Sequence, residues 1–195
     1  MTRVGGVTRG WRNWFLDEKL GGTQIFDRHI HDSDLVLWLL GKPQAVRSVG
    51  RVEAVGGTVH CFTHYQFPHV TVHAEGSADC APRFPFTMAF SAIFDRGTLL
   101  YSNRLSPTLT LYQEDGEVTV PKLPNPLGEA ATGYSTAGLN ITSTSGYYFE
   151  QRTLFDCVRK GTPPSVVTPE TGRNTVALVR LEMESIRTGE AVRVP

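Results

Sequence analysis

The sequence has no excess of either charge and few cysteines. Its 195 residues include 19 Lys and Arg and 19 Asp and Glu, so the formal net charge is zero. A nucleic-acid-binding protein usually carries a basic face, and this balance argues against that class of partner. The three cysteines, Cys61, Cys80 and Cys157, are odd in number and form no CxxC pair. They argue against a disulfide framework and predict a reducing, cytoplasmic setting.

Long apolar runs are also missing. The longest, from Leu35 to Leu40, has six residues, whereas a membrane-spanning helix needs about 20. The N-terminal stretch MTRVGGVTRGW has no apolar core of the kind found in a signal peptide. We therefore expect the protein to have no membrane partner.

A glycine-rich loop of the form GxGxxG is absent as well. The closest stretch, GGVTRG at residues 5–10, has the wrong spacing, and no helix is predicted behind it. A dinucleotide needs such a loop because its pyrophosphate binds at a helix N-terminus. We therefore expect no dinucleotide to bind to this chain alone.

Periodicity predicts an α+β fold with helices at both ends and strands between them. The first helix is expected to be capped by Thr23 and to end near Gly41-Lys42-Pro43. From about Gln44 to Val120 the apolar residues alternate with polar ones, and short turn signals separate the runs. The strand candidates are residues 45–55, 58–65, 69–74, 86–94, 98–102, 108–113 and 118–121.

The rest of the chain is predicted to be a long loop and two helices. The loop covers residues 122–143, one helix runs from Ser145 to Lys160, and the last opens at Thr168-Pro169-Glu170 and ends near Thr188. Consecutive strands with short turns imply an open, mainly antiparallel sheet, with the helices packed on one face. We expect one domain over residues 1–195.

The second face of this sheet is predicted to contact another copy of the chain. In the strand at residues 58–65, one face presents Val59, Cys61, Thr63 and Tyr65, and the other presents His60, Phe62 and His64. Both faces are partly apolar, whereas a solvated face would alternate more cleanly. A homodimer through the sheet is one interpretation; surface aromatic residues that need no partner are the other.

The predicted first helix carries an unusual set of ionisable residues in GGTQIFDRHIHDSDLVLWLLG, residues 21–41. On an α-helix Asp27 and His31 share a face because they are four residues apart, and Asp34 lies on nearly the same side. A carboxylate beside an imidazole fixes the tautomer of the ring and raises its basicity, which suits a general base.

Two other interpretations of these residues remain open. An Asp–His pair at this spacing also serves as a structural hydrogen bond that ties a helix to its surroundings. A metal-dependent hydrolase is a weaker alternative, because the segment only partly matches HxHxDH: Ser33 and Asp34 stand where an acid and a histidine are needed. On a helix His29 and His31 would also diverge, so one ion could not bind both. His29 and Asp32 are expected to be incidental to the chemistry.

The chain resembles the Gfo/Idh/MocA oxidoreductase family over about residues 11 to 194. The family's C-terminal domain shows a GG turn, then DxxxHxxD, then an aromatic residue and LxGxP. This sequence matches that pattern with Gly21-Gly22, Asp27, His31, Asp34 and the ending Trp38 to Pro43. Further matches are residues 94–99, 161–164, 167–172 and 184–192, in the family's order.

The resemblance implies an activity and roles for individual residues. Family members are NAD(P)-dependent dehydrogenases or reductases that act on sugars, polyols and related alcohols. By this resemblance His31 exchanges a proton with the substrate hydroxyl, and Asp27 orients and tunes His31, while a hydride passes between substrate and nicotinamide. Asp34 supports the helix, and Trp14 lies near the substrate.

The resemblance covers only one half of such an enzyme, because no N-terminal Rossmann domain is present. We therefore expect the substrate-binding and oligomerisation half of an NAD- or NADP-dependent oxidoreductase, inactive alone. A separate Rossmann-domain chain is a possible partner. The alternative is a non-catalytic binding or assembly module that retains the fold.

Overall fold

A computed structural model describes residues 1–6, 10–54, 56–122 and 145–195. The strands are β1 Thr2–Gly6, β2 Ala45–Val52, β3 Thr58–Gln66, β4 Thr71–Cys80, β5 Thr87–Phe94, β6 Gly97–Ser102, β7 Leu109–Gln113, β8 Val118–Thr119 and β9 Val192–Arg193. The helices are η1 Trp11–Leu16, η2 Ile25–His29, α1 Ile30–Leu40, α2 Ser145–Lys160 and α3 Pro169–Thr188. Apart from Lys122, the long loop predicted at residues 122–143 lies outside the described residues.

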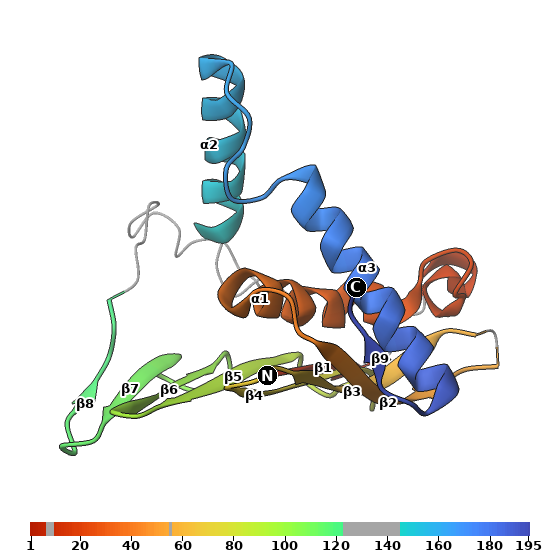
Figure 1. The fold of residues 1–195 in the computed structure, drawn as a ribbon, viewed down its shortest axis with the longest axis horizontal. Coiled ribbons are helices and arrows are strands. Elements are labelled where there is room, and N and C mark those ends of the chain that lie inside the picture. The colour runs from red at the N-terminus through yellow and green to blue at the C-terminus, as the bar shows by residue number, and fades with distance from the viewer. Residues whose placement is uncertain (7–9, 55, 123–144) are drawn as a thin grey trace.

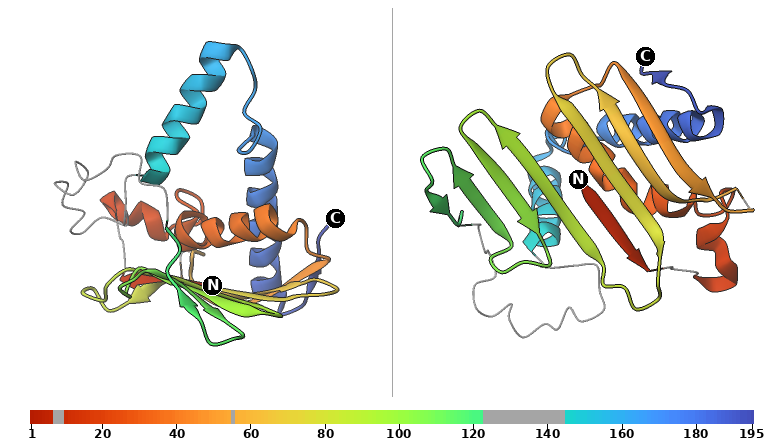
Figure 2. Two further views of the ribbon diagram at one scale, coloured as in Figure 1. Left: turned by 90° about the vertical axis from the view of Figure 1, so that its left-hand side faces the viewer. Right: turned by 90° about the horizontal axis from the view of Figure 1, so that it is seen from below.

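The strands form one nine-stranded sheet in the order β8-β7-β6-β5-β1-β4-β3-β2-β9. β1 runs parallel to β4, and the other pairings of the described strands are antiparallel. α1 and α3 lie on the same face of the sheet, and the opposite face carries no described helix (Figures 1 and 2). The predicted α+β class with an open, mainly antiparallel sheet is confirmed.

The predicted facing of β3 is also confirmed. Val59, Cys61 and Tyr65 are buried under the helices, whereas Phe62 on the opposite face is 49% exposed. Tyr65 belongs to a core cluster that joins three strands to α1 and α3: Val36, Val46, Tyr65, Val72, Ala74 and Leu178. Full burial of each large apolar side chain contributes about 1.5–3 kcal/mol, so this cluster fixes the helices on the sheet.

The last helix, α3, begins and ends as its sequence predicts. The Thr168 hydroxyl accepts the Thr171 amide at 3.2 Å, and the Thr171 hydroxyl accepts the Thr168 amide at 2.9 Å. Pro169 occupies the first turn, and Gly189 follows the helix with a φ of 73°. A left-handed residue after the last turn satisfies helix carbonyls at low steric cost when it is glycine.

The first helix differs from its prediction at the N-terminal end. Thr23 is not a cap: its φ is 64°, and its hydroxyl donates to the Thr58 carbonyl at 2.7 Å. The chain then forms one π-helical turn, η2, before α1 begins at Ile30. The end of α1 at Leu40, just before Gly41, agrees with the prediction.

Three strands also depart from the prediction, and one of them, β9 at Val192–Arg193, was not among the strand candidates. β1 was not among the strand candidates, yet it lies between β4 and β5 near the middle of the sheet. β4 runs to Cys80, beyond the predicted end at residue 74, because it has partners on both sides, β3 and β1. Hydrogen bonds to a neighbouring strand on each side stabilise β4 beyond the point where apolar and polar residues stop alternating in its sequence.

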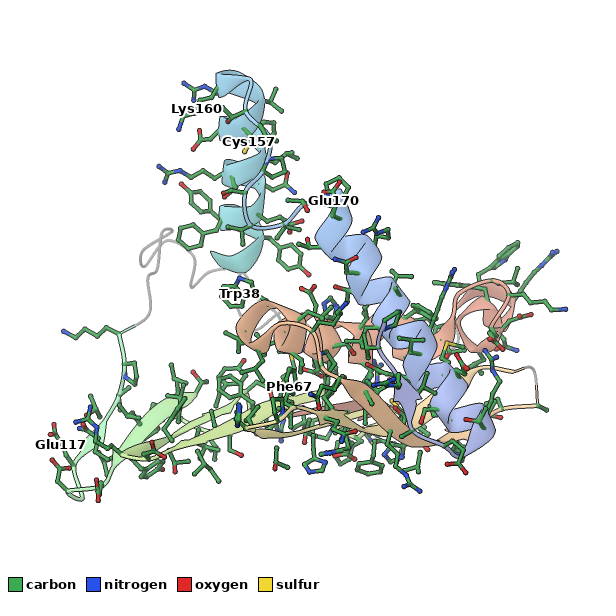
Figure 3. The ribbon with its side chains drawn as sticks, in the orientation of Figure 1. Trp38, Phe67, Glu117, Cys157, Lys160 and Glu170 are labelled. Atoms are coloured by element: carbon green, nitrogen blue, oxygen red, sulfur yellow. The ribbon has the colours of Figure 1, made fainter. Side chains whose placement is uncertain are left out.

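α2 stands apart from the rest of the fold. It rises away from the sheet and from α1, with Cys157 and Lys160 near its outer end (Figures 1 and 3). One side of this helix is apolar and exposed, and it presents Tyr147, Leu154, Phe155 and Val158. No helix among the described residues is long and apolar enough to cross a membrane.

Candidate functional site

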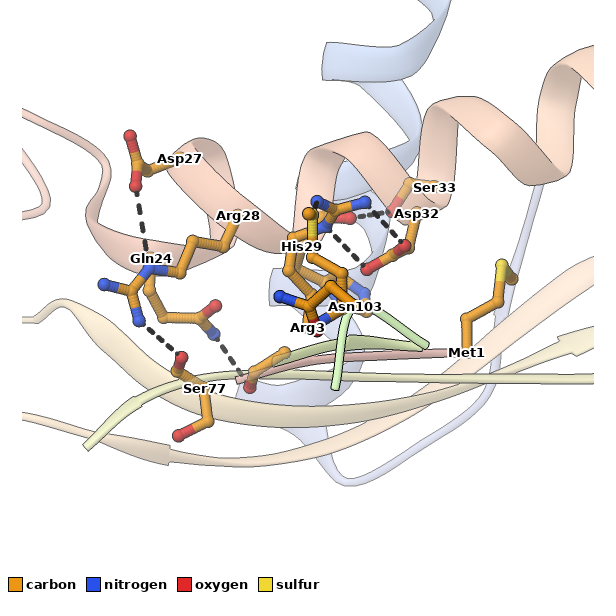
Figure 4. Close-up of polar contacts among 12 residues, drawn as sticks. Met1, Arg3, Gln24, Asp27, Arg28, His29, Asp32, Ser33, Ser77 and Asn103 are labelled. Carbon is orange, nitrogen blue, oxygen red and sulfur yellow. Dashed lines mark hydrogen bonds and ion pairs between the residues drawn. The ribbon is translucent and has the colours of Figure 1, made fainter. Parts of the chain in front are cut away.

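The π turn η2 is held to the sheet by side chains on both sides of Asp27. Gln24 Nε2 donates to the Gly76 carbonyl at 3.2 Å. Arg28 donates through Nη1 to the Ser77 carbonyl at 2.9 Å and through Nη2 to the Gly6 carbonyl at 3.1 Å. Figure 4 shows the Arg28–Ser77 contact reaching from the helix to the strand. Single π turns within helices are rare and are found frequently at functional sites.

This turn separates Asp27 from His31. The Ile30 amide bonds to the Ile25 carbonyl, so the turn contains one more residue than an α-helical turn and the four-residue alignment is not kept. Asp27 is half exposed, and its Oδ2 lies 3.8 Å from Arg28 Nε. Within the described residues, no hydrogen bond joins Asp27 to His31. The predicted roles of Asp27 and His31 stay predictions.

The surroundings of His31 lower the pKa of its ring. Partial burial of the ring and the nearby guanidinium of Arg3 lower the pKa of His31, against the opposing effect of three carboxylates. Those carboxylates belong to Asp32, Asp27 and Asp34. A histidine whose pKa is lowered from 6.5 is neutral at pH 7, which is the state a general base needs.

His31 lines a cleft of about 1100 Å³ between α1 and α3. Asp34 also lines it and accepts a hydrogen bond from the Thr175 hydroxyl at 2.6 Å, which ties α1 to α3. This contact agrees with the supporting role expected for Asp34. The other lining residues include apolar Leu35, Trp38, Val167, Val176 and Leu181 and polar Lys42, Thr171 and Asn174.

Trp14 lies outside this cleft. It is on η1, 42% exposed, and its indole packs against the backbone of Gly21, where an added Cβ would come within 2.5 Å of the ring. The structure therefore does not bring Trp14 together with His31 in the α1–α3 cleft. Its assignment to substrate remains a prediction from the resemblance.

His29 and Asp32, which were expected to be incidental, are the most buried ionisable residues of the segment. His29 is fully buried, and its Nε2 lies 2.8 Å from Glu182 Oε2 on α3. Burial lowers the pKa of His29, but neighbouring Cys61 and Glu182 outweigh it and raise that pKa well above 6.5. No local pattern in the sequence predicts this pair, since Glu182 comes near the other end of the chain.

Asp32 joins α1 to the middle of the sheet. Its two carboxylate oxygens accept hydrogen bonds from Arg3 Nε and Nη2, each at 3.2 Å. The Asp32 side chain is 5% exposed and that of Arg3 is 18% exposed. A bidentate, largely buried pair of this kind fixes geometry as well as charge. Arg3 belongs to β1, which was not predicted, so this partner was missed too.

The histidines of the segment do not converge on one point. His29 is buried against Glu182, whereas His31 is exposed at the cleft, so the two rings lie in different environments. Across the part of the chain that the structure describes, no group of three or more His, Cys, Asp or Glu residues is arranged to hold a metal ion.

Comparison with known proteins gives a consistent picture. The sequence model of the GFO/IDH/MocA C-terminal domain family matches residues 2–100. Levoglucosan dehydrogenase in complex with NADH and levoglucosan has a similar fold, with a TM-score of 0.77 and 15% identity over 100% of this chain. UDP-N-acetylglucosamine 3-dehydrogenase GnnA from Acidithiobacillus ferrooxidans is similar over 96% of this chain, with a TM-score of 0.64 and 15% identity.

The chain is much shorter than these solved structures. It spans 57% of the levoglucosan dehydrogenase chain and 52% of the GnnA chain. No curated protein matches the sequence. At these identities the structural likeness establishes the fold, and the family match rests on the sequence itself.

Proposed function

The chain belongs to the GFO/IDH/MocA C-terminal domain family, and on that premise we propose that it is the substrate-binding half of an NAD(P)-dependent oxidoreductase acting on a sugar, a polyol or a related alcohol. The observation that carries the proposal is His31, a ring with a lowered pKa at an open cleft between α1 and α3. Both named relatives are dehydrogenases of sugars or of a sugar nucleotide.

In this proposal His31 accepts the proton of the substrate hydroxyl. The carboxylates of Asp27 and Asp34 lie close enough to favour the charged ring that results, so they stabilise His31 after the proton has moved. Asp27 is the residue that would tune His31, and it would act through space rather than through a hydrogen bond. Trp14 would contribute to substrate binding only if the substrate extends toward η1.

We propose that this chain does not hold the dinucleotide itself. Its sequence has no GxGxxG loop, which is the loop that cradles the pyrophosphate in Rossmann-type sites. NAD or NADP, which supplies hydride chemistry to such enzymes, would be held by a further domain, in the same protein or in a separate Rossmann-domain chain. We therefore propose that the chain is inactive alone.

The apolar side of α2 supports a further domain of this kind. Tyr147, Leu154, Phe155 and Val158 expose a stripe along a helix whose opposite side carries the Arg152–Asp156 ion pair. Such a helix is normally covered on its apolar side. The relatives have additional chain beyond the part that this fold covers, and we propose that the additional domain packs on α2.

Calorimetric titration with NADH tests this division of labour. The isolated chain is expected to release no binding heat with NADH at micromolar to submillimolar concentrations, because the phosphate cradle is absent. The same chain joined to a dinucleotide-binding domain is expected to bind. A micromolar dissociation constant for the isolated chain would contradict the proposal.

We further propose that the open face of the sheet forms a homodimer. Figure 2 shows this face without a covering helix, and Val49 and Phe62 are exposed there as cross-strand partners. Light scattering at about tens of micromolar protein is expected to show a dimer, since such concentrations populate interfaces of standard size.

A charge placed on the open face tests the dimer. Phe62→Glu is expected to give monomers, because it would bury a carboxylate in an apolar contact. Val118→Glu makes the same type of change on exposed β8, at the far edge of the sheet, and is expected to leave the dimer intact. A wild-type protein that is monomeric in this range would refute the interface.

A further inference from the structure

We propose that the buried pair of His29 and Glu182 is a positioning device: it fastens the π turn η2 to α3 and so determines the position of Asp27 on that turn and of His31 at the cleft. The inference rests on the proposed function for its importance to chemistry. The positions themselves can be tested without any catalysis.

The pair is surrounded by hydrogen bonds. Ser33 Oγ donates to Glu182 Oε1 at 3.0 Å, and Thr63 Oγ1 donates to Oε2 at 3.4 Å. The hydroxyls of Thr63 and Tyr65 also lie 3.2 Å and 3.3 Å from His29 Nε2. Both partners of the ion pair are fully buried. A network of this kind favours one arrangement of its members, because a displaced buried charge loses several contacts at once. The bonds to the His29 ring converge on Nε2, while His29 Nδ1 is buried without a hydrogen-bond partner among the described residues.

The pair differs from the other anchors of the π turn. Thr23, Gln24 and Arg28 bond to strand carbonyls, so they hold the turn to the sheet. His29 reaches a helix instead, through Glu182 of α3. α3 also forms one wall of the cleft that His31 lines. The pair therefore fixes the turn relative to the wall opposite His31.

The fit of His29 against the sheet is close as well. An added Cβ at Gly76 would lie 2.7 Å from His29 Cβ and 2.9 Å from His29 Nδ1. The glycine lets the imidazole lie directly on the β4 backbone. His29 is thus held by the strand below and by α3 at its side, between Asp27 and His31 in the sequence.

Burial alone does not require charges at these two positions. A buried ion pair can often be replaced by apolar residues of similar size without loss of stability. Leu at both positions would fill the space but would lose the directional bonds. The structure thus offers a variant that retains packing and removes only the fixed geometry.

The titration of His31 reports on this geometry. The charged groups with the largest effects on its pKa are Arg3, Asp32, Asp27 and Asp34. Replacing both partners also leaves the summed charge of the pair unchanged when His29 is protonated. A change in the titration of His31 would therefore mean that the ring or its neighbours had moved.

The experiment is a pH titration of the His31 ring by NMR in the full chain, with the signal assigned through His31→Asn. In the double variant His29→Leu/Glu182→Leu, the titration midpoint of the His31 ring is expected to move by about half a pH unit or more. A change in the distance between the ring and a neighbouring charge would cause a shift of this size. Ser185→Ala is the control. It removes the hydroxyl that accepts the Ser48 amide at 2.8 Å, a different buried contact of α3, and is expected to leave the midpoint unchanged.

An unchanged midpoint in a stable double variant would overturn the proposal, and so would an equal shift in Ser185→Ala. If the double variant does not fold, His29→Leu/Glu182→Gln is judged by the same criterion, because it removes the ion pair, leaves an acceptor for Ser33 and Thr63 and keeps the summed charge of the two positions at zero. The catalytic role of His31 is decided separately by activity. A shifted midpoint together with full activity of His31→Asn would support positioning and refute the proposed function.

Discussion

Replacing Glu182 by Ala is expected to lower the free energy of unfolding by about 3–5 kcal/mol, because it leaves a buried histidine without its counter-charge. Glu182 and His29 are both fully buried and 2.8 Å apart. Ser33 and Thr63 lose an acceptor at the same time. Urea unfolding at pH 6, where His29 is protonated, measures the change as a lower midpoint with an unchanged slope.

Glu184 provides a matched control for this replacement. It lies two residues further along α3 and is exposed, so Glu184→Ala is expected to change the free energy of unfolding by less than about 0.5 kcal/mol. A loss below about 1 kcal/mol for Glu182→Ala would show that the pair contributes little to stability.

The loss of unfolding free energy in Glu182→Ala is expected to depend on pH, because the His29–Glu182 pair contains a titratable histidine. The pKa of His29 is raised in the folded state, so the stability that its protonation contributes is fully present below the unfolded value of about 6.5. That contribution is lost as the pH rises through the raised folded value. The difference between wild type and Glu182→Ala should therefore be largest near pH 6 and should decrease toward alkaline pH.

Replacing His31 by Asn is expected to reduce kcat/KM about 10²–10⁴-fold in a protein completed with a dinucleotide-binding domain. The Asn amide is polar and occupies roughly the space of the imidazole atoms nearest to Cβ, but it cannot accept the substrate proton. Cofactor binding should be unchanged, since the dinucleotide is held elsewhere. Steady-state kinetics with a panel of sugars and polyols, alongside NADH titration, separates the two effects.

His69 offers the comparison for this variant. It is exposed in the turn between β3 and β4, and His69→Asn is expected to retain activity. A reduction of less than about tenfold for His31→Asn would remove this residue from proton transfer. Asp27→Asn should have a smaller effect than His31→Asn, because Asp27 acts on His31 only through space.

The sequence was sufficient to predict the consecutive strands from β2 to β8 and the facing of β3, because alternation is local. Val59, Cys61 and Tyr65 occur at every second position, and each lies under the helices as predicted. The ends of α3 were also predictable, since Thr168, Pro169 and Gly189 act within one turn of their own positions. Each of these features depends on residues that are neighbours in the chain.

The polar site was less predictable because its contacts are distant in sequence. An i, i+4 argument placed His29 away from the chemistry, yet its partner, Glu182, comes from α3. Asp32 similarly pairs with Arg3 of β1. The π turn itself follows from such contacts: side chains bonded to Gly76, Ser77 and Thr58 hold a turn that local propensity does not favour.

The position of β1 has a consequence for how the chain folds. Among the described strands, β1 alone pairs with both β4 and β5, so without it the hydrogen-bonded sheet would be two four-stranded pieces. Met1 donates its amino group to the carbonyl of His73, 72 positions later, and β5 is more distant still. Because long loops must close before such pairings form, β1 is expected to pair later than strands that follow one another in the chain. The consecutive strands β2 to β4 and β5 to β8 can each pair early, whereas β1 and β9, whose partners are distant in the chain, join them afterwards.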